Sequence, residues 1–200
     1  MLEFWQAHLT FALLALLLVP FIKQRLGLNI ALLAGFLAIS FLPVDGLPLA
    51  VYLRAITDDL AITTLVALLY AVSVRMGLAK AARPQVRGQA LLLFSGLALL
   101  LYPPTLGLTY FDPYRLGYHP RPLLLAVGLL TLAFILARNA LVVCMLGLAT
   151  LAFSLQLKPS PNYWDYLLDP FIAVYCWAGL LFTGLRKAWC SAMAWRRAER

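Results

Sequence analysis

Charged residues are scarce in this sequence. Of its 200 residues, 12% are charged and 64% are hydrophobic, and the mean hydropathy is +0.88. A soluble globular domain carries charge on roughly a quarter of its residues. With half that proportion, much of the surface is expected to contact lipid. The composition therefore predicts a membrane protein.

Cysteine and histidine are also too few and too dispersed to form a metal site. The three cysteines, Cys144, Cys176 and Cys190, are far apart and form no Cys-x-x-Cys pair. The two histidines, His8 and His119, do not occupy matching depths of two apolar runs, as a haem would require. The sequence therefore predicts no metal and no cofactor.

Motifs of the common catalytic and phosphate-binding sites are missing as well. No Gly-x-Ser-x-Gly, P-loop or His-Glu-x-x-His pattern occurs. The net charge is +8, but the basic residues stand between apolar runs and do not gather on one face. We therefore predict no nucleic-acid partner and assign no catalytic residue.

What the sequence has in abundance is long apolar runs. A membrane helix needs about 20 apolar residues. The runs predict an all-α polytopic membrane protein, a single domain over residues 1–200 with seven transmembrane helices. The predicted spans are residues 4–22, 26–42, 60–78, 88–102, two within 123–157, and 170–185.

Two stretches need a separate interpretation. Residues 47–57 are short and contain Pro48, Tyr52 and Arg54, so they predict an interfacial half-helix. A helix over the whole of 123–157 would be about 50 Å long, too long for one crossing. A turn at Arg138–Asn139 therefore divides this run, and six spans are the alternative if it does not.

The basic residues predict an orientation. With seven spans, twelve of the sixteen Lys and Arg fall on one side, which the positive-inside rule makes cytoplasmic. The N-terminus is then outside and the C-terminus is cytoplasmic. Residues 186–200 become a basic cytoplasmic tail on anionic lipid. The twelve are Lys23, Arg25, Arg75, Lys80, Arg83, Arg87, Arg138, Arg186, Lys187, Arg196, Arg197 and Arg200.

Three outer loops carry polar residues that form one candidate binding cluster. Within it, Arg54 and Asp58 are four residues apart on a helix and could pair. Thr57 or Asp58 could also cap the helix that follows. The members of the cluster are Arg54, Asp58 and Asp59; Asp112, Arg115 and His119; and Asn162, Asp165 and Asp169.

Several members of this cluster also have a structural interpretation. Asp169 followed by Pro170 is typical of the start of a helix, and Asp112 before Pro113 could open a short turn in the same way. Trp164 and Tyr166 fit an aromatic belt at the membrane surface.

Within the stretch 162–170, these structural roles leave Asn162 and Asp165 without one. The candidate site then depends on whether Asp165 faces the loop that carries Asp112 and Arg115.

The leading functional hypothesis is a non-catalytic, multi-pass accessory subunit of a bacterial inner membrane. Its periplasmic loops would dock a membrane or periplasmic partner protein, with envelope lipid or glycan assembly as the setting, and could bind an anionic lipid head group. The alternative is a small membrane enzyme acting on a lipid-linked phosphorylated substrate. Its acid, base or metal ligands would be Asp112, Asp165 and Asp169, with Arg54 and Arg115 on the phosphate. A transporter is disfavoured because the span interiors hold almost no ionisable residue.

Overall fold

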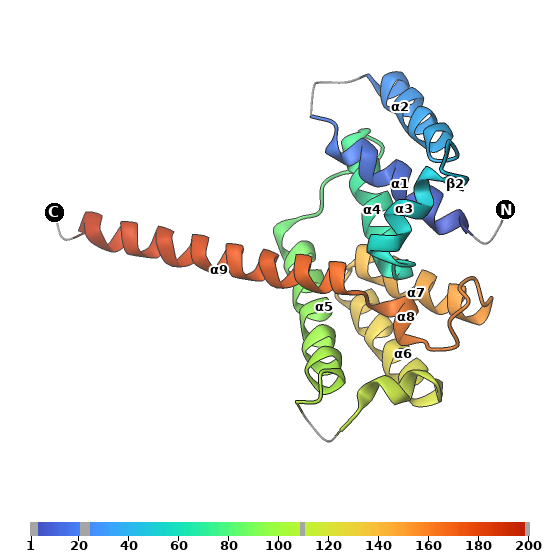
Figure 1. Cartoon of the computed structure of the whole chain (residues 1–200). Coiled ribbons are helices and arrows are strands. Elements are labelled where there is room, and N and C mark those ends of the chain that lie inside the picture. The colour runs from blue at the N-terminus through green and yellow to red at the C-terminus, as the bar shows by residue number, and fades with distance from the viewer. Residues whose placement is uncertain (1–3, 21–24, 109–110, 199–200) are drawn as a thin grey trace.

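The chain is a bundle of helices with one short β-hairpin (Figure 1). The computed structural model describes residues 4–20, 25–108 and 111–198, without the side chains of residue 192 and residues 194–198. The predicted stop of the first span at Lys23 and Gln24 lies outside the described residues.

The first half of the chain forms a layer around α1. In this half α1 packs against α2, α3 and α4, and a tight hairpin separates α2 from α3. The elements are α1 (Trp5–Leu18), α2 (Leu26–Ile39), β1 (Pro43–Val44), β2 (Leu47–Pro48), α3 (Leu49–Thr57) and α4 (Ile62–Arg75).

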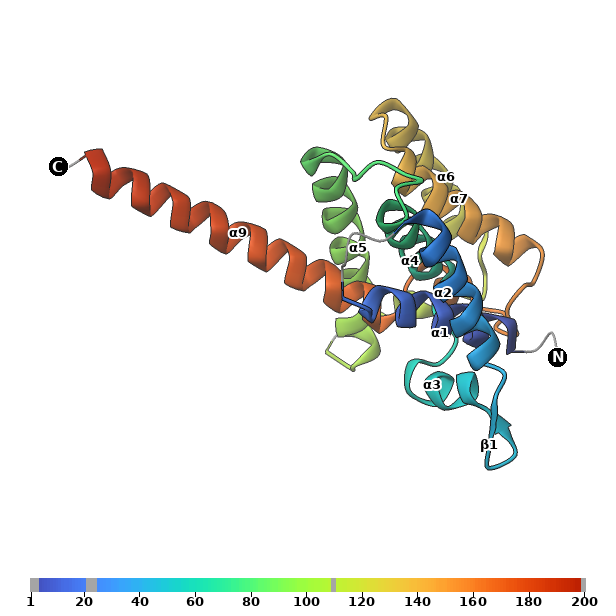
Figure 2. The same cartoon turned by 90° about the horizontal axis from the view of Figure 1, so that it is seen from above.

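The second half packs against this layer through α4 and α7. Within it α6 lies along α7, and α5 crosses the first half of α9 (Figure 1). The rest of α9 extends away from the bundle in both views (Figures 1 and 2). The elements are α5 (Pro84–Thr105), the 3₁₀ turn η2 (Pro113–Gly117), α6 (Arg121–Leu136), α7 (Ala140–Ser154), α8 (Trp164–Leu167) and α9 (Pro170–Ala198).

Helix boundaries follow local signals in the sequence. Pro84 stands in the first turn of α5 and Pro170 opens α9, where a missing N–H costs nothing. Arg138 ends the α6 segment with φ +53°, and the Asn139 side chain caps α7 by accepting from Val142 N–H at 3.1 Å. The run 123–157 therefore does form two helices, divided at Arg138–Asn139.

The prediction of seven transmembrane helices is wrong. Within residues 4–20, 25–108 and 111–198, α5 is the one helix that is both long and apolar enough to cross a bilayer. The other apolar helices have 14 to 16 residues. At 1.5 Å per residue they reach roughly 21–24 Å, short of about 30 Å of hydrocarbon. α9 is longer, but its second half carries Arg186 and Lys187.

Three further predictions are corrected by the structure. The assignment of the N-terminus outside and the C-terminus inside depended on seven alternating spans, so it has no remaining basis. The half-helix expected over 47–57 begins at Leu49, because Leu47 and Pro48 pair with the preceding strand. Residues 186–198 continue α9 and do not form a separate tail.

Charge is nevertheless separated along the bundle. Arg75 lies in the last turn of α4, and Arg83 and Arg87 flank the start of α5. Asp58 and Asp59 precede α4, on the end of the bundle where α5 finishes. One end is therefore basic and the other acidic, about 33 Å apart along the 22 residues of α5.

The aromatic residues around α8 belong to the core at the acidic end. Tyr163, Trp164 and Tyr166 are at most 1% exposed. The expectation that Trp164 and Tyr166 belong to an exposed belt is therefore wrong. Their rings bury large apolar areas and their polar atoms find partners, as with Trp164 Nε1, which donates to Pro113 O at 2.9 Å.

Candidate functional site

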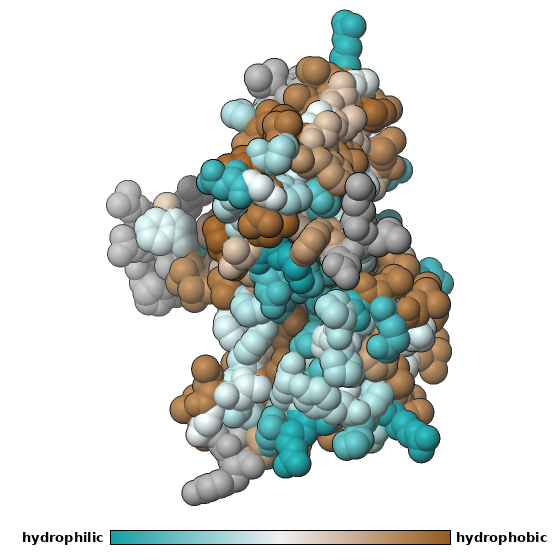
Figure 3. Space-filling model, turned by 45° about the vertical axis from the view of Figure 1, so that its right-hand side comes forward, coloured by the Kyte–Doolittle hydropathy of each residue, from teal (hydrophilic) through white to brown (hydrophobic). Residues whose placement is uncertain are grey.

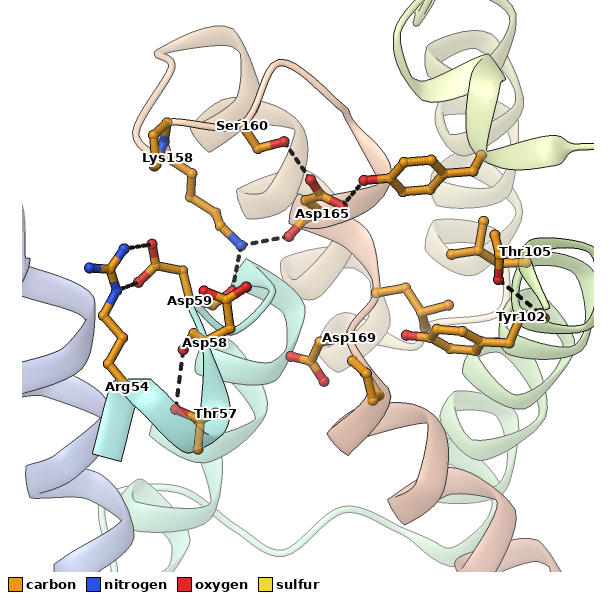
Figure 4. A pocket seen from close by; sticks show the side chains of 15 residues that line it. Arg54, Thr57, Asp58, Asp59, Tyr102, Thr105, Lys158, Ser160, Asp165 and Asp169 are labelled. Atoms are coloured by element: carbon orange, nitrogen blue, oxygen red, sulfur yellow. Dashed lines mark hydrogen bonds and ion pairs between the residues drawn. The ribbon is translucent and has the colours of Figure 1, made fainter. Parts of the chain in front are cut away.

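A cavity of about 570 Å³ opens at the acidic end of the bundle. Its walls are the end of α3 with the connection to α4, the end of α5, and the segment that leads from α7 to α9 (Figure 4). Six charged side chains line it: Arg54, Asp58, Asp59, Lys158, Asp165 and Asp169. Five of them belong to the cluster predicted from the sequence.

Arg54 forms a bidentate ion pair with Asp59. Its Nε and Nη2 donate to the two carboxylate oxygens, each at 2.8 Å. The guanidinium also lies 5.2 Å from the ring centre of Phe4. The prediction that Arg54 pairs with Asp58 is wrong. Asp58 ends α3 at φ +54° and ψ −165°, and the chain turns there. That turn brings Asp59 to the guanidinium.

Asp58 is the exposed carboxylate of the cavity. Its backbone occupies a region that side chains rarely adopt and that favours glycine. No residue that the structure describes donates a hydrogen bond to its carboxylate. Asp58 therefore presents to the cavity a carboxylate that accepts no hydrogen bond from the described residues.

Asp169 joins two helix starts. Its Oδ1 accepts from Ile172 N–H at 2.8 Å, which confirms it as the cap of α9. Its Oδ2 accepts from Ala61 N–H, also at 2.8 Å. Ala61 is the residue before α4, so neither Thr57 nor Asp58 caps that helix as expected. Asp169 holds the α9 and α4 walls of the cavity together.

Asp165 does face the loop of residues 112–115, through Tyr114. The Tyr114 hydroxyl donates to Oδ1 at 2.9 Å, and the Ser160 hydroxyl donates to Oδ2. Burial raises the pKa of the Tyr114 phenol above its ordinary range, and its bond to the Asp165 carboxylate adds to this. Asp165 thus ties the segment between α7 and α9 to η2.

Lys158 is the functional residue that the sequence did not reveal. It is 6% exposed, and its Nζ donates to three backbone carbonyls, Asp59 O at 2.7 Å, Leu60 O at 3.1 Å and Asp165 O at 2.8 Å. Burial lowers the pKa of its ammonium group, and the surrounding aspartates oppose that shift. The one signal in the sequence was a lysine before Pro159 on the predicted outer side, which holds few basic residues.

Asn162 has a structural role. It is fully buried; its Oδ1 accepts from Trp164 N–H at 2.9 Å and its Nδ2 donates to Tyr114 O at 3.1 Å. A Cβ on Gly117 would lie 1.7 Å from Asn162 Oδ1, so only glycine admits this side chain. Asn162 thereby docks the loop before α8 onto η2.

The remaining predicted members lie outside the cavity. Asp112 caps η2 by accepting from Tyr114 N–H at 3.0 Å, as its position before Pro113 indicated. Arg115 and His119 are exposed on the surface around η2 and do not line the cavity. The enzyme hypothesis required Asp112 and Arg115 beside Asp165, and this arrangement is not present among the described residues.

The cavity therefore suits binding of a group that carries positive charge. Its four carboxylates face two cations, and both cations are already engaged by Asp59 or by carbonyl oxygens. In the described part of the chain, no cluster of three or more His, Cys, Asp or Glu is placed to hold a metal ion.

Relatives do not identify this site. Comparison of the chain with protein-family models, with curated proteins and with solved structures found no match.

Proposed function

We propose that this protein is a non-catalytic accessory subunit of the bacterial inner membrane. Its acidic cavity, defined by Arg54, Asp58, Asp59, Lys158, Asp165 and Asp169, docks a lysine or arginine side chain of a partner protein. Envelope lipid or glycan assembly is the proposed setting. The observation that carries the proposal is the unbalanced negative charge of the cavity.

The membrane location is supported by apolar side chains that face outward. On α6, one face carries Leu125, Leu129, Leu132 and Leu136, which are 53–78% exposed. Their spacing of three and four residues makes them a continuous stripe along the helix. Contiguous apolar stripes on a surface mark contact with lipid or protein.

Hydrophilic and apolar surfaces are visible on the same face of the molecule. Hydrophilic side chains gather in the centre and lower part of the face shown in Figure 3, and apolar side chains cover its upper part. A protein surrounded by water would expose so much apolar area only at a cost of about 25 cal/mol per Å².

Charge complementarity favours a cationic partner group. An anionic group would meet the exposed carboxylate of Asp58 and find Arg54 already paired with Asp59. A cationic group would pair with Asp58 without displacing any hydrogen bond that the structure shows. Charged groups at a partly desolvated site fix the choice of partner more than they raise affinity.

The test is site-specific photo-crosslinking in cells at native expression level. A crosslinker at Thr105, which lines the cavity, is expected to trap a discrete partner protein. A crosslinker at Ala126, which is exposed on α6, is the position control. The Asp58→Asn variant should reduce the Thr105 adduct several-fold, because a pairing charge is lost.

Asp45→Asn is the matched charge control. Asp45 is also exposed and also has a positive φ, but it lies in the β-hairpin turn, away from the cavity. The proposal fails if Asp45→Asn reduces the adduct as much as Asp58→Asn does. It also fails if Thr105 and Ala126 trap the same proteins.

A further inference from the structure

A second cavity, of about 350 Å³, lies among α4, α5, α7 and α9. Its lining is mostly apolar and includes the side chains of Ala67, Ala71, Ala90, Leu91, Phe94 and Met145. Alanine side chains on α4 and α5 are too short to fill the space between these helices. The cavity is open to the surface on one side.

One charged residue, Arg87, stands in the described lining of this cavity. It lies near the start of α5, and no other residue that the structure describes hydrogen-bonds or pairs with its guanidinium. Lys80 and Arg83 belong to the same connection between α4 and α5. Tyr70, which also lines the cavity, donates to Lys80 O at 2.9 Å and ties this connection down.

No acidic residue in the described lining compensates Arg87. Asp58, Asp59, Asp165 and Asp169 line the first cavity, at the other end of α4 and α5. The potential at this end is therefore positive next to an apolar slot. That combination selects an occupant with one anionic end and one long apolar part.

We propose that this second cavity binds an acyl chain of an anionic phospholipid whose phosphate pairs with Arg87. The proposal rests on the membrane location proposed above. Burial of a chain yields about 0.8 kcal/mol per CH₂. A guanidinium forms two parallel hydrogen bonds to a phosphate. Basic pockets between membrane helices hold anionic lipid head groups in this way.

Other occupants fit less well. Water would find few polar partners along the alanine and leucine walls. A zwitterionic lipid would bring its ammonium group towards the basic connection with Lys80 and Arg83. A free anion would pair with Arg87 but leave the apolar slot empty.

Native mass spectrometry of the full chain in detergent tests the proposal, with added phosphatidylglycerol or phosphatidylethanolamine. The expected result is one tightly bound phosphatidylglycerol, with phosphatidylethanolamine bound roughly tenfold more weakly, as loss of one charged contact implies. Arg87→Gln should remove that preference. Its side chain is exposed and makes no described contact, so the variant is expected to fold.

Two controls separate this site from general lipid binding. Arg121→Gln removes an exposed arginine at the start of α6 and should leave the preference unchanged. Ala90→Phe fills the slot and should lower phosphatidylglycerol binding, whereas Ala126→Phe on the exposed face of α6 should not.

Three results would overturn the proposal. The first is equal binding of the two lipids by the unaltered chain. The second is an equal loss of preference in Arg87→Gln and Arg121→Gln. The third is competition by glycerol phosphate as effective as competition by the whole lipid, which would mean that the acyl chain contributes nothing. None of these results bears on crosslinking from Thr105, so the two proposals can fail separately.

Discussion

Asp169 and Ala61, which are 108 positions apart in the sequence, are joined by a hydrogen bond of 2.8 Å between carboxylate and backbone N–H. The same carboxylate caps α9 through Ile172 N–H. One buried side chain thus sets the relative position of α4 and α9, which form two walls of the acidic cavity.

Replacing Asp169 should destabilise the fold more than replacing an ordinary cap does. We expect Asp169→Ala to lower the free energy of unfolding by about 3 kcal/mol, because a helix cap and a buried hydrogen bond are lost together. Asp112→Ala removes the cap of the exposed turn η2 and should cost about 1 kcal/mol or less. Denaturant unfolding in detergent measures both, and equal losses would contradict the joining role of Asp169.

Lys158 should prove necessary for the cavity wall. Lys158→Met keeps much of the apolar stem but removes the ammonium donor from Asp59 O and Asp165 O, whereas Leu60 O keeps a second donor in Gln6 Nε2. We expect a loss of about 3 kcal/mol or more, since each unsatisfied buried group costs about 1–3 kcal/mol. Lys80→Met is the control, because Lys80 is exposed, and it should change stability by less than about 0.5 kcal/mol.

Substitutions at Gly117 and Asn162 should have coupled effects on the free energy of unfolding. Gly117→Ala places a Cβ 1.7 Å from Asn162 Oδ1 and 2.9 Å from Trp164 Cδ1. We expect a loss of about 3 kcal/mol from this overpacking, part of which Asn162→Ala in the same chain should restore. Gly128→Ala meets open space on α6 and should stabilise by about 0.5–1 kcal/mol. Additive effects of the Gly117 and Asn162 changes would count against the contact.

Tyr114 should ionise late on alkaline titration. Its pKa is raised in the folded chain by burial and by the Asp165 carboxylate. The folded state therefore favours the neutral phenol. The stability that this gives is fully present below the ordinary tyrosine pKa of about 10 and is lost as pH rises through the raised pKa.

Ultraviolet difference spectra of phenolate formation measure this titration. Tyr114→Phe should remove one late-titrating group, and Asp165→Asn should shift that group towards lower pH, because the negative neighbour is removed. If the phenolate signal of Asp165→Asn rises over the same pH range as that of the unaltered chain, Asp165 does not influence Tyr114.

Replacing Asp58 by glycine should raise the stability of the chain and weaken binding of the partner. Asp58→Gly relieves a backbone conformation that favours glycine and should stabilise the chain by about 1 kcal/mol. It should also reduce the crosslink from Thr105, because the exposed carboxylate is lost. Asp45→Gly relieves a positive φ in the hairpin turn and should stabilise without changing the crosslink. A full crosslink in Asp58→Gly would mean that this carboxylate contacts no partner.

Much of the local structure could be predicted from the sequence. Pro170 indicated a helix start, Arg138–Asn139 indicated a turn, and the apolar runs indicated helices. The number of spans could not be predicted in this way. An apolar run gives only the upper limit of a helix. The helices α2, α6 and α7 end earlier, at the caps Ser40, Ala137 and Leu155.

The cavity was predicted in part. Polar residues in loops at the same end of the apolar runs pointed to Arg54, Asp58, Asp59, Asp165 and Asp169, but their spacing paired Arg54 with Asp58 instead of Asp59. Asp58 and Asp59 are adjacent in sequence, and the turn at φ +54° decides which one meets Arg54. Lys158 escaped notice because its partners are backbone carbonyls, which no side-chain pattern reveals.

The sequence by itself determined composition, helix propensity and the residues that begin and end helices, because these depend on neighbours within a few positions. Only the tertiary structure decided that Lys158 and Asp169 hold α4, α8 and α9 around one cavity. The contacts of Asp169 with Ala61 and of Lys158 with Asp59 join residues about a hundred positions apart, and their geometry follows from how whole helices pack.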